Sequence, residues 1–149
     1  MRYLNKIVFI NSAAIRYSEV QLDGNIHLIG TQGVGKSTIL RAILFFYNAD
    51  TQRLGIPVEK KSYQDYYFPY ADSSIIYEVA REDGWFTVLS YKTMNRICYR
   101  FIASPYRPDL FIDEEGAPYP SDRIRSVLDK NGIKYSGAIS TYEEYRNIL

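Results

Sequence analysis

The residues whose types and spacing point most directly to chemistry are those at positions 30–37, which read Gly-Thr-Gln-Gly-Val-Gly-Lys-Ser. They match the pattern G-x-x-x-x-G-K-[ST] at every fixed position. The glycines let the backbone curl so that successive N–H groups point into one concavity, which suits phosphate oxygens. Lys36 would place a positive charge at the β- and γ-phosphates, and Ser37 would offer its hydroxyl to Mg²⁺. The motif therefore predicts a Walker A loop that binds ATP with Mg²⁺.

The residues that we expect to bind the nucleotide form one short stretch, the loop and the start of the helix after it. They are Gly30, Gln32, Gly33, Val34, Gly35, Lys36, Ser37 and Thr38, with Ser37 as the metal ligand. The alternative is a tight turn that only looks like such a loop. An apolar run before the motif and an amphipathic run after it argue against that alternative.

Two elements must position this loop, a strand before it and a helix after it. Residues 26–29 are a short apolar run that predicts the strand. Residues 38–48 predict the helix, because Ile39, Ala42 and Ile43 recur at helical spacing and would share one face with Phe46. The N-terminus of this helix would add its own N–H groups to the phosphate site.

The rest of the chain alternates strand and turn patterns and ends in helical ones. Ser121 is the expected cap of a helix that ends at Asn131 and Gly132, and Ser140 opens a capping box for a final helix. We expect an α/β fold: a mixed sheet with the loop's helix on one face and an antiparallel portion over residues 74–103. The strands are expected at residues 6–10, 17–22, 26–29, 74–81, 85–92, 96–103 and 110–113.

Composition limits the class of protein. With 149 residues, 46% hydrophobic and 23% charged, the sequence fits one ordinary soluble domain. No apolar run approaches the roughly 18 residues of a membrane helix, and the single cysteine excludes an internal disulfide. We therefore expect a cytoplasmic protein with no membrane partner. The formal net charge of +1 gives no overall support for a nucleic-acid partner.

Residues 6–40 resemble the start of an ABC-type ATPase head of the SMC kind (structural maintenance of chromosomes). The matching stretches are Ile-Val-Phe-Ile-Asn at 7–11, Glu-Val-Gln-Leu-Asp-Gly at 19–24, and the strand and loop at 26–37. Gln32 stands where that family usually has Asn, another amide. Residues 66–79 (Tyr-Tyr-Phe-Pro-Tyr-Ala-Asp-Ser-Ser-Ile-Ile-Tyr-Glu-Val) are similar to the corresponding part of bacterial MukB-like and plasmid-defence SMC-like proteins.

The resemblance implies a P-loop NTPase fold and a split ATPase head. Residues 1–149 would be an N-terminal fragment of that head, and its C-terminal half would supply the signature motif and the Walker B acidic pair. Two heads would then sandwich ATP and act on DNA. The resemblance therefore implies an ATPase only as part of a longer protein, with no catalytic residue within this chain.

Asp113 and Glu114 follow a short apolar run and offer two further interpretations. As a Walker B pair they would end a core strand beside the loop, but the run is only three residues long and prolines flank it, so an ordinary strand and turn is favoured. The stretch from Asp113 to Gly116 also fits the D-x-x-G of GTPases, although no N-K-x-D follows it. The alternatives to an ATPase are thus a GTPase and a nucleotide-regulated binding module without turnover.

Four other residues have possible roles that simpler interpretations outweigh. Gln64 could contact Mg²⁺ and water as a Q-loop glutamine, and Arg53 could reach a phosphate or DNA, but both fit exposed loop positions. His27 has no second ligand at metal-binding spacing and is expected to be structural. Cys98 has no nearby base, so a catalytic thiol is not expected.

Overall fold

The computed structural model describes residues 2–13, 15–22, 36–46, 66–93 and 96–139. These residues form a five-stranded sheet and two α-helices. In chain order the elements are β1 (Arg2–Ser12), β2 (Ile15–Gln21), α1 (Lys36–Phe46), β3 (Ser74–Arg81), β4 (Gly84–Thr93), β5 (Arg96–Ile102), the 3-10 turn η2 (Pro108–Leu110) and α3 (Ser121–Lys130).

The strand order is β2-β1-β3-β4-β5, and every neighbouring pair is antiparallel. Short turns explain most of this arrangement, because a tight hairpin can join only antiparallel strands. Arg81 pairs with Gly84 across the turn between β3 and β4, and Gly84 has φ 139°, a conformation that glycine adopts at little cost. Strand β3 then lies against β1, with Tyr77 opposite Ile7.

This topology corrects the expected fold class. A P-loop NTPase has an α/β fold with parallel strands joined by crossover helices, whereas the described residues form an antiparallel sheet with only two short helices. The prediction of a P-loop NTPase with a mixed sheet is therefore wrong. The antiparallel portion expected over residues 74–103 is confirmed as β3, β4 and β5. The expected strand at residues 26–29 lies outside the described residues.

Two local predictions were also wrong in detail. The strand expected at residues 110–113 is instead the turn η2 followed by one isolated bridge between Ile112 and Pro118. Pro108 explains this, because proline is favoured at the first positions of a helical turn. Ser121, the expected cap, is instead the first residue of α3; Pro120 occupies the N-cap position, and no side chain caps the helix.

Each face of the sheet has its own hydrophobic core, because successive side chains of a strand point to opposite faces. We call them the α1 face and the α3 face after the helices that they contact. The α1 face includes Ile7, Phe9, Ile75, Tyr77, Val79 and Val88, packed against Ile39, Ala42, Ile43 and Phe46 of α1. The α3 face includes Val8, Ile10, Ile76, Leu89 and Cys98, packed against Leu110, Phe111, Ile124 and Leu128.

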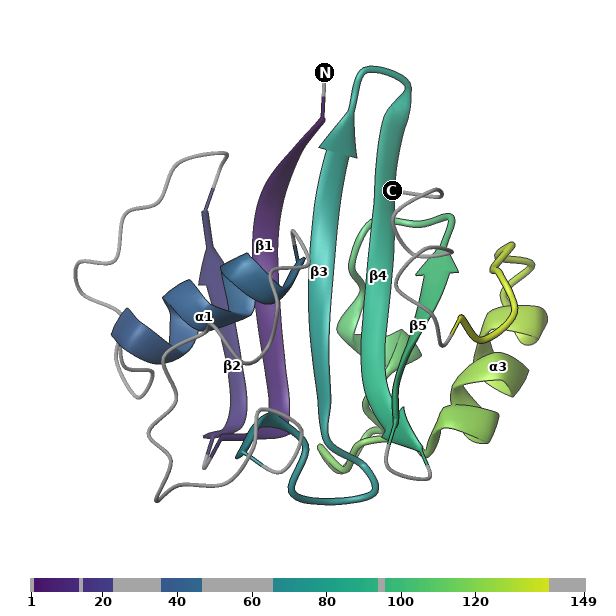
Figure 1. Ribbon diagram of the computed structural model, residues 1–149. Coiled ribbons are helices and arrows are strands. Elements are labelled where there is room, and N and C mark those ends of the chain that lie inside the picture. The colour runs from purple at the N-terminus through teal and green to yellow at the C-terminus, as the bar shows by residue number, and fades with distance from the viewer. Residues whose placement is uncertain (1, 14, 23–35, 47–65, 94–95, 140–149) are drawn as a thin grey trace.

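The helices cover different parts of the sheet. Figure 1 shows α1 lying across β1 and β2, and α3 at the opposite side of the sheet, beyond β5.

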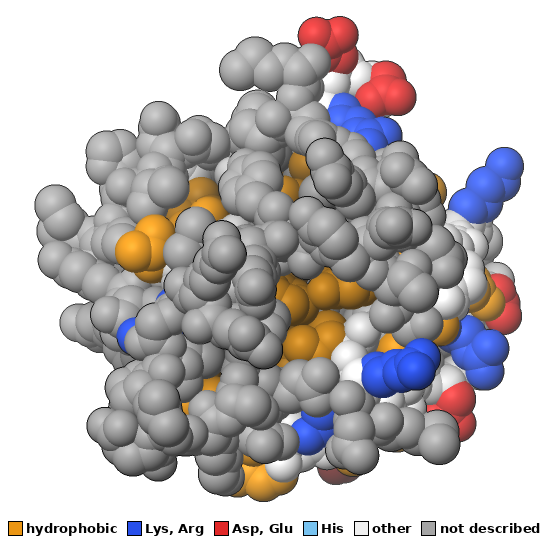
Figure 2. Space-filling view, in the orientation of Figure 1, with side chains coloured by type: hydrophobic (Ala, Val, Ile, Leu, Met, Phe, Trp, Pro, Cys, Tyr) orange, Lys and Arg blue, Asp and Glu red, His pale blue; other side chains and the backbone are white. Residues whose placement is uncertain are grey.

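On the side of the molecule drawn in Figure 2, charged side chains of both signs are mixed along the right-hand edge, and hydrophobic side chains are visible near the centre. Neither helix of the described part is long and apolar enough to span a membrane.

Candidate functional site

Helix α1 begins at Lys36, the lysine of the G-x-x-x-x-G-K-[ST] motif. Lys36 and Ser37 occupy its first two positions, and Thr38 follows in the same turn. The expected helix after the loop is therefore confirmed, with a start two residues earlier than the pattern indicated. The first turn contains no acidic residue, so nothing in it opposes the attraction of an anion to the helix N-terminus. Residues Gly30, Gln32, Gly33, Val34 and Gly35 lie outside the described residues.

Thr38 is largely buried in the first turn of α1, so its backbone N–H is the group to consider for anion binding. Its side chain is 9% exposed, and its Oγ1 lies 3.4 Å from the hydroxyl of Tyr66. The first four N–H groups of an α-helix lack intrahelical partners, which is why helix N-termini bind phosphate. The assignment of Thr38 as a binding residue is therefore compatible with a buried side chain.

Two fully buried tyrosines bind the backbone of α1. The Tyr67 hydroxyl donates to the Thr38 carbonyl oxygen at 2.8 Å, and the Tyr77 hydroxyl donates to the Ala42 carbonyl oxygen at 2.9 Å. Burial raises the pKa of Tyr67, which keeps this hydroxyl protonated and able to donate. The two accepting carbonyls are four residues apart, so they lie on one side of the helix.

Aromatic packing holds the C-terminal end of α1. The Phe46 ring lies 4.9 Å from the Tyr77 ring, and the Phe45 ring stacks on Tyr99 of β5 at 5.8 Å, measured between centroids. Aromatic pairs at such distances are attractive beyond the area that they bury. Together with the two hydroxyl contacts, they fix α1 on the sheet along its length.

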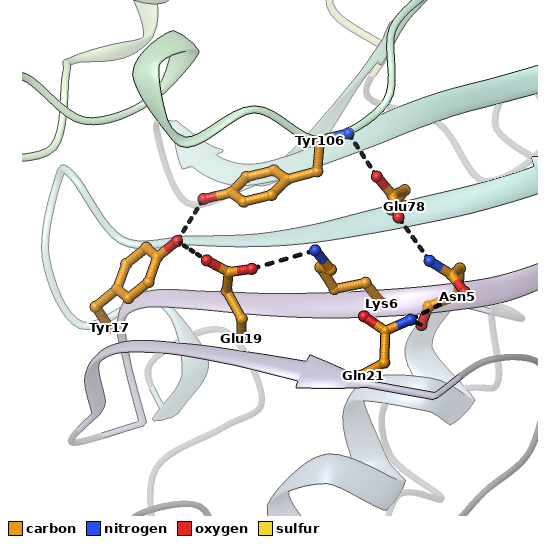
Figure 3. A network of polar contacts seen from close by, with 7 residues as sticks. All are labelled: Asn5, Lys6, Tyr17, Glu19, Gln21, Glu78 and Tyr106. Atoms are coloured by element: carbon orange, nitrogen blue, oxygen red, sulfur yellow. Dashed lines mark hydrogen bonds and ion pairs between the residues drawn. The ribbon is translucent and has the colours of Figure 1, made fainter.

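A polar network lies on the α3 side of β1, β2 and β3 (Figure 3). At its centre is Glu78, which is only 6% exposed. Its two carboxylate oxygens accept from the Asn5 side-chain amide and from the Tyr106 backbone N–H, each at 2.7 Å. Gln21 donates in turn to the Asn5 side-chain oxygen at 3.1 Å. The carboxylate therefore ties β3 to β1 and to the segment after β5, and Asn5 extends the network to Gln21 of β2.

The outer end of the same network is formed by phenols and one ion pair. The Tyr17 hydroxyl donates to Glu19 at 2.7 Å and lies 2.8 Å from the Tyr106 hydroxyl, while Lys6 Nζ is 3.2 Å from Glu19. Burial raises the pKa of Tyr17 to about 12 and raises that of Tyr106 as well. Both groups are therefore neutral donors near neutral pH, and the network has a structural role.

Sequence reasoning missed this network. The one signal in the sequence was Glu78, a single acidic residue within the apolar run of β3. Its partners Asn5 and Tyr106 are far away along the chain, so no local pattern could have identified them.

Asp113 does not have the placement of a Walker B aspartate. Its side-chain oxygen accepts from the backbone N–H groups of Glu115 and Ala117, both at 2.9 Å, which closes a turn. The adjoining Phe111 packs on the α3 face, whereas α1 packs on the other face. Glu114 is exposed in the same turn, and the Gly116 N–H donates to the Asp113 carbonyl. The geometry thus matches the turn of the favoured strand-and-turn interpretation, whereas the strand before it is absent.

Of the other candidate residues, only Cys98 lies in the described part. It is buried on the α3 face, and burial raises the pKa of its thiol, so it lacks the thiolate character of a reactive cysteine. His27, Arg53 and Gln64 lie outside the described residues. Among the described residues, no group of three or more His, Cys, Asp or Glu side chains could hold a metal ion.

The described residues form an antiparallel sheet with a helix on each face, and one of these helices starts at the lysine of the G-x-x-x-x-G-K-[ST] motif. A family model described as "Protein of unknown function (DUF3584)" matches residues 11–149. The chain therefore belongs to this family. No curated protein and no solved structure matches the chain.

Proposed function

We propose that this chain binds the triphosphate of ATP, together with Mg²⁺, through residues 30–38. The observation that supports the proposal most strongly is the start of α1 at Lys36. A Walker A loop works only if its lysine and hydroxyl residue open a helix whose N–H groups face the phosphates. Lys36 is thus both the lysine of the motif and the first residue of the helix.

The proposed roles follow from the chemistry of each residue. Lys36 supplies a charge to the β- and γ-phosphates, Ser37 supplies a hydroxyl to Mg²⁺, and the backbone N–H groups of the loop surround the phosphate oxygens. These contacts depend on the loop and on the first turn of α1. They do not require parallel strands, so the antiparallel sheet does not remove the basis of the proposal.

The wider proposal is that the chain acts as the N-terminal half of a split, SMC-like ATPase head that works on DNA. It is supported by the resemblance of residues 6–40. In this scheme a C-terminal half supplies the acidic pair and the signature segment, and two heads engage each other across ATP. The turn that contains Asp113 lies on the other side of the sheet from α1, which favours a catalytic carboxylate supplied from elsewhere.

Calorimetric titration with a non-hydrolysable ATP analogue and Mg²⁺ tests the proposal. Lys36→Ala removes a charge-assisted contact, which is worth about 1.5–3 kcal/mol, so binding should weaken by roughly tenfold to a hundredfold. Lys130→Ala, at the end of α3, is the matched control and should bind like the wild type. Wild-type affinity in Lys36→Ala would remove the basis of the proposal.

The same titration with GTP in competition separates ATP from the GTPase alternative. No guanine-reading motif is visible, so the chain should not prefer GTP. A preference for GTP beyond about tenfold, or ~1.4 kcal/mol, would favour the GTPase alternative instead.

A further inference from the structure

We propose that Tyr67 and Tyr77 are positioning residues for the nucleotide site, because their hydroxyls hold α1 in one register on the sheet. This inference rests on the proposed function, since it concerns how the first turn of α1 is held in place for phosphate binding. Neither tyrosine belongs to the Walker A motif.

The contact geometry is specific to one register. The Tyr67 and Tyr77 hydroxyls donate at 2.8 and 2.9 Å to carbonyls four residues apart, those of Thr38 and Ala42. With about 3.6 residues per turn, a register shift of one residue turns each carbonyl by about 100° around the helix axis. Such a shift would break both hydrogen bonds together, so the pair fixes both the rotation and the axial position of α1.

These two hydrogen bonds can be removed without a large defect in the core. A carbonyl oxygen has two lone pairs, so each accepting oxygen can still accept its intrahelical N–H when the phenol is absent. Tyr→Phe also keeps the ring, including the contact between Tyr77 and Phe46 at 4.9 Å. The substitution therefore removes the positioning contact and leaves the aromatic packing in place.

The contact of Tyr67 is the one closer to the proposed site. Thr38 is two residues after Lys36 and lies in the first turn of α1, whereas Ala42 lies in the second. A small displacement of the first turn moves the N–H groups that face the phosphates, and such contacts depend steeply on geometry. We therefore expect Tyr67→Phe to weaken phosphate binding more than Tyr77→Phe does.

The experiment uses the whole chain as wild type, Tyr67→Phe, Tyr77→Phe and the double variant. Each is titrated with the Mg²⁺ complex of a non-hydrolysable ATP analogue and, separately, with inorganic tripolyphosphate and Mg²⁺. Tyr106→Phe is the matched control, because it removes a buried hydroxyl on the other face, where that group contacts Tyr17. Far-UV circular dichroism and the thermal midpoint of each free protein are recorded alongside.

The double variant should bind both ligands about tenfold more weakly, equivalent to ~1.4 kcal/mol, and Tyr106→Phe should stay within about twofold of the wild type. If the affinity for tripolyphosphate falls by the same factor as the affinity for the ATP analogue, the effect lies at the phosphates. A lower thermal midpoint with unchanged affinity would mean a purely structural role and would overturn the inference. If Tyr67→Phe does not fold, Tyr77→Phe decides alone: wild-type affinity for both ligands overturns the inference.

Lys36→Ala separates this inference from the proposed function. If Lys36→Ala weakens binding and the tyrosine variants do not, the inference fails and the proposed function stands. If the wild type does not bind, or Lys36→Ala binds equally well, the proposed function fails and the inference fails with it.

Discussion

The two faces of the sheet hold their covering segments in different ways. On the α1 face, the hydroxyls of Tyr67 and Tyr77 bind backbone carbonyls, so the helix is fixed as a unit. On the α3 face, the buried carboxylate of Glu78 binds a side-chain amide and one backbone N–H, so it joins strands and a loop segment. Within the described residues, the helix on the α1 face is the one that starts at Lys36, which we propose to bind phosphate. Changes on this face should therefore affect both stability and ligand affinity, whereas changes on the α3 face should affect stability alone.

The largest expected effect comes from truncating one large core residue on each face. Phe46→Ala on the α1 face should lower the free energy of unfolding by about 3–5 kcal/mol, and Leu128→Ala on the α3 face by about 2–5 kcal/mol. Both side chains are buried, at 1% and 0% exposure. Urea unfolding measures the loss, and titration with the ATP analogue below the unfolding transition measures affinity.

The two variants should then differ in affinity. Phe46→Ala loosens the C-terminal end of α1 and should weaken binding, whereas Leu128→Ala should bind like the wild type once the fraction of folded protein is taken into account. Leu40→Ala is a control for the helix itself, because Leu40 of α1 is 44% exposed. It should leave both the unfolding free energy and the affinity nearly unchanged. Equal loss of affinity on both faces would contradict the comparison.

The next effect concerns the buried carboxylate. Glu78→Ala leaves the Asn5 amide and the Tyr106 N–H buried without their acceptor and should cost about 1.5–3 kcal/mol of unfolding free energy. The measurement is again urea unfolding. Glu19→Ala, at the exposed rim of the same network, should cost about 0–1 kcal/mol. A smaller loss for Glu78→Ala than for Glu19→Ala would show that the buried centre does not hold the network together.

The local elements could be predicted from the sequence, because their signals are local. The apolar and aromatic runs in residues 74–103, separated by turn residues that end at Gly84, indicated the three strands that the structure contains. The helical spacing of Ile39, Ala42 and Ile43 identified the buried side of α1. These patterns report which side of an element is buried, and both faces of this sheet are covered.

The pairing of distant strands could not be predicted in this way. Tyr77 lies opposite Ile7, and Glu78 binds Asn5, across about half the length of the chain. An alternating pattern fits a parallel or an antiparallel neighbour, so it left the direction of β3 against β1 open. The resemblance to a P-loop NTPase then suggested parallel strands, which the described residues do not contain.

The smallest effect expected is at alkaline pH. The pKa of Tyr17 is raised from 10.0 to about 12 in the folded protein, mainly by burial. The unfolded chain therefore loses this proton first as the pH rises, so stability falls between pH ~10 and ~12. Tyr17→Phe removes this titrating group and its contact with the Tyr106 hydroxyl, so it should lose less stability than the wild type over that interval. Urea unfolding at both pH values measures the loss of unfolding free energy. Tyr70→Phe is the control, because Tyr70 is 63% exposed. An unchanged pH slope in Tyr17→Phe would contradict the assignment.

We propose that nucleotide binds at the start of α1 and not at the acidic turn on the other side of the sheet. Amide hydrogen exchange with and without the Mg²⁺ complex of the ATP analogue tests this most directly, since bound phosphates should protect the amides that they accept from. We expect new protection in peptides covering residues 30–39, with α3 and residues 111–118 unchanged. Protection at residues 111–118 with none at residues 30–39 would contradict it.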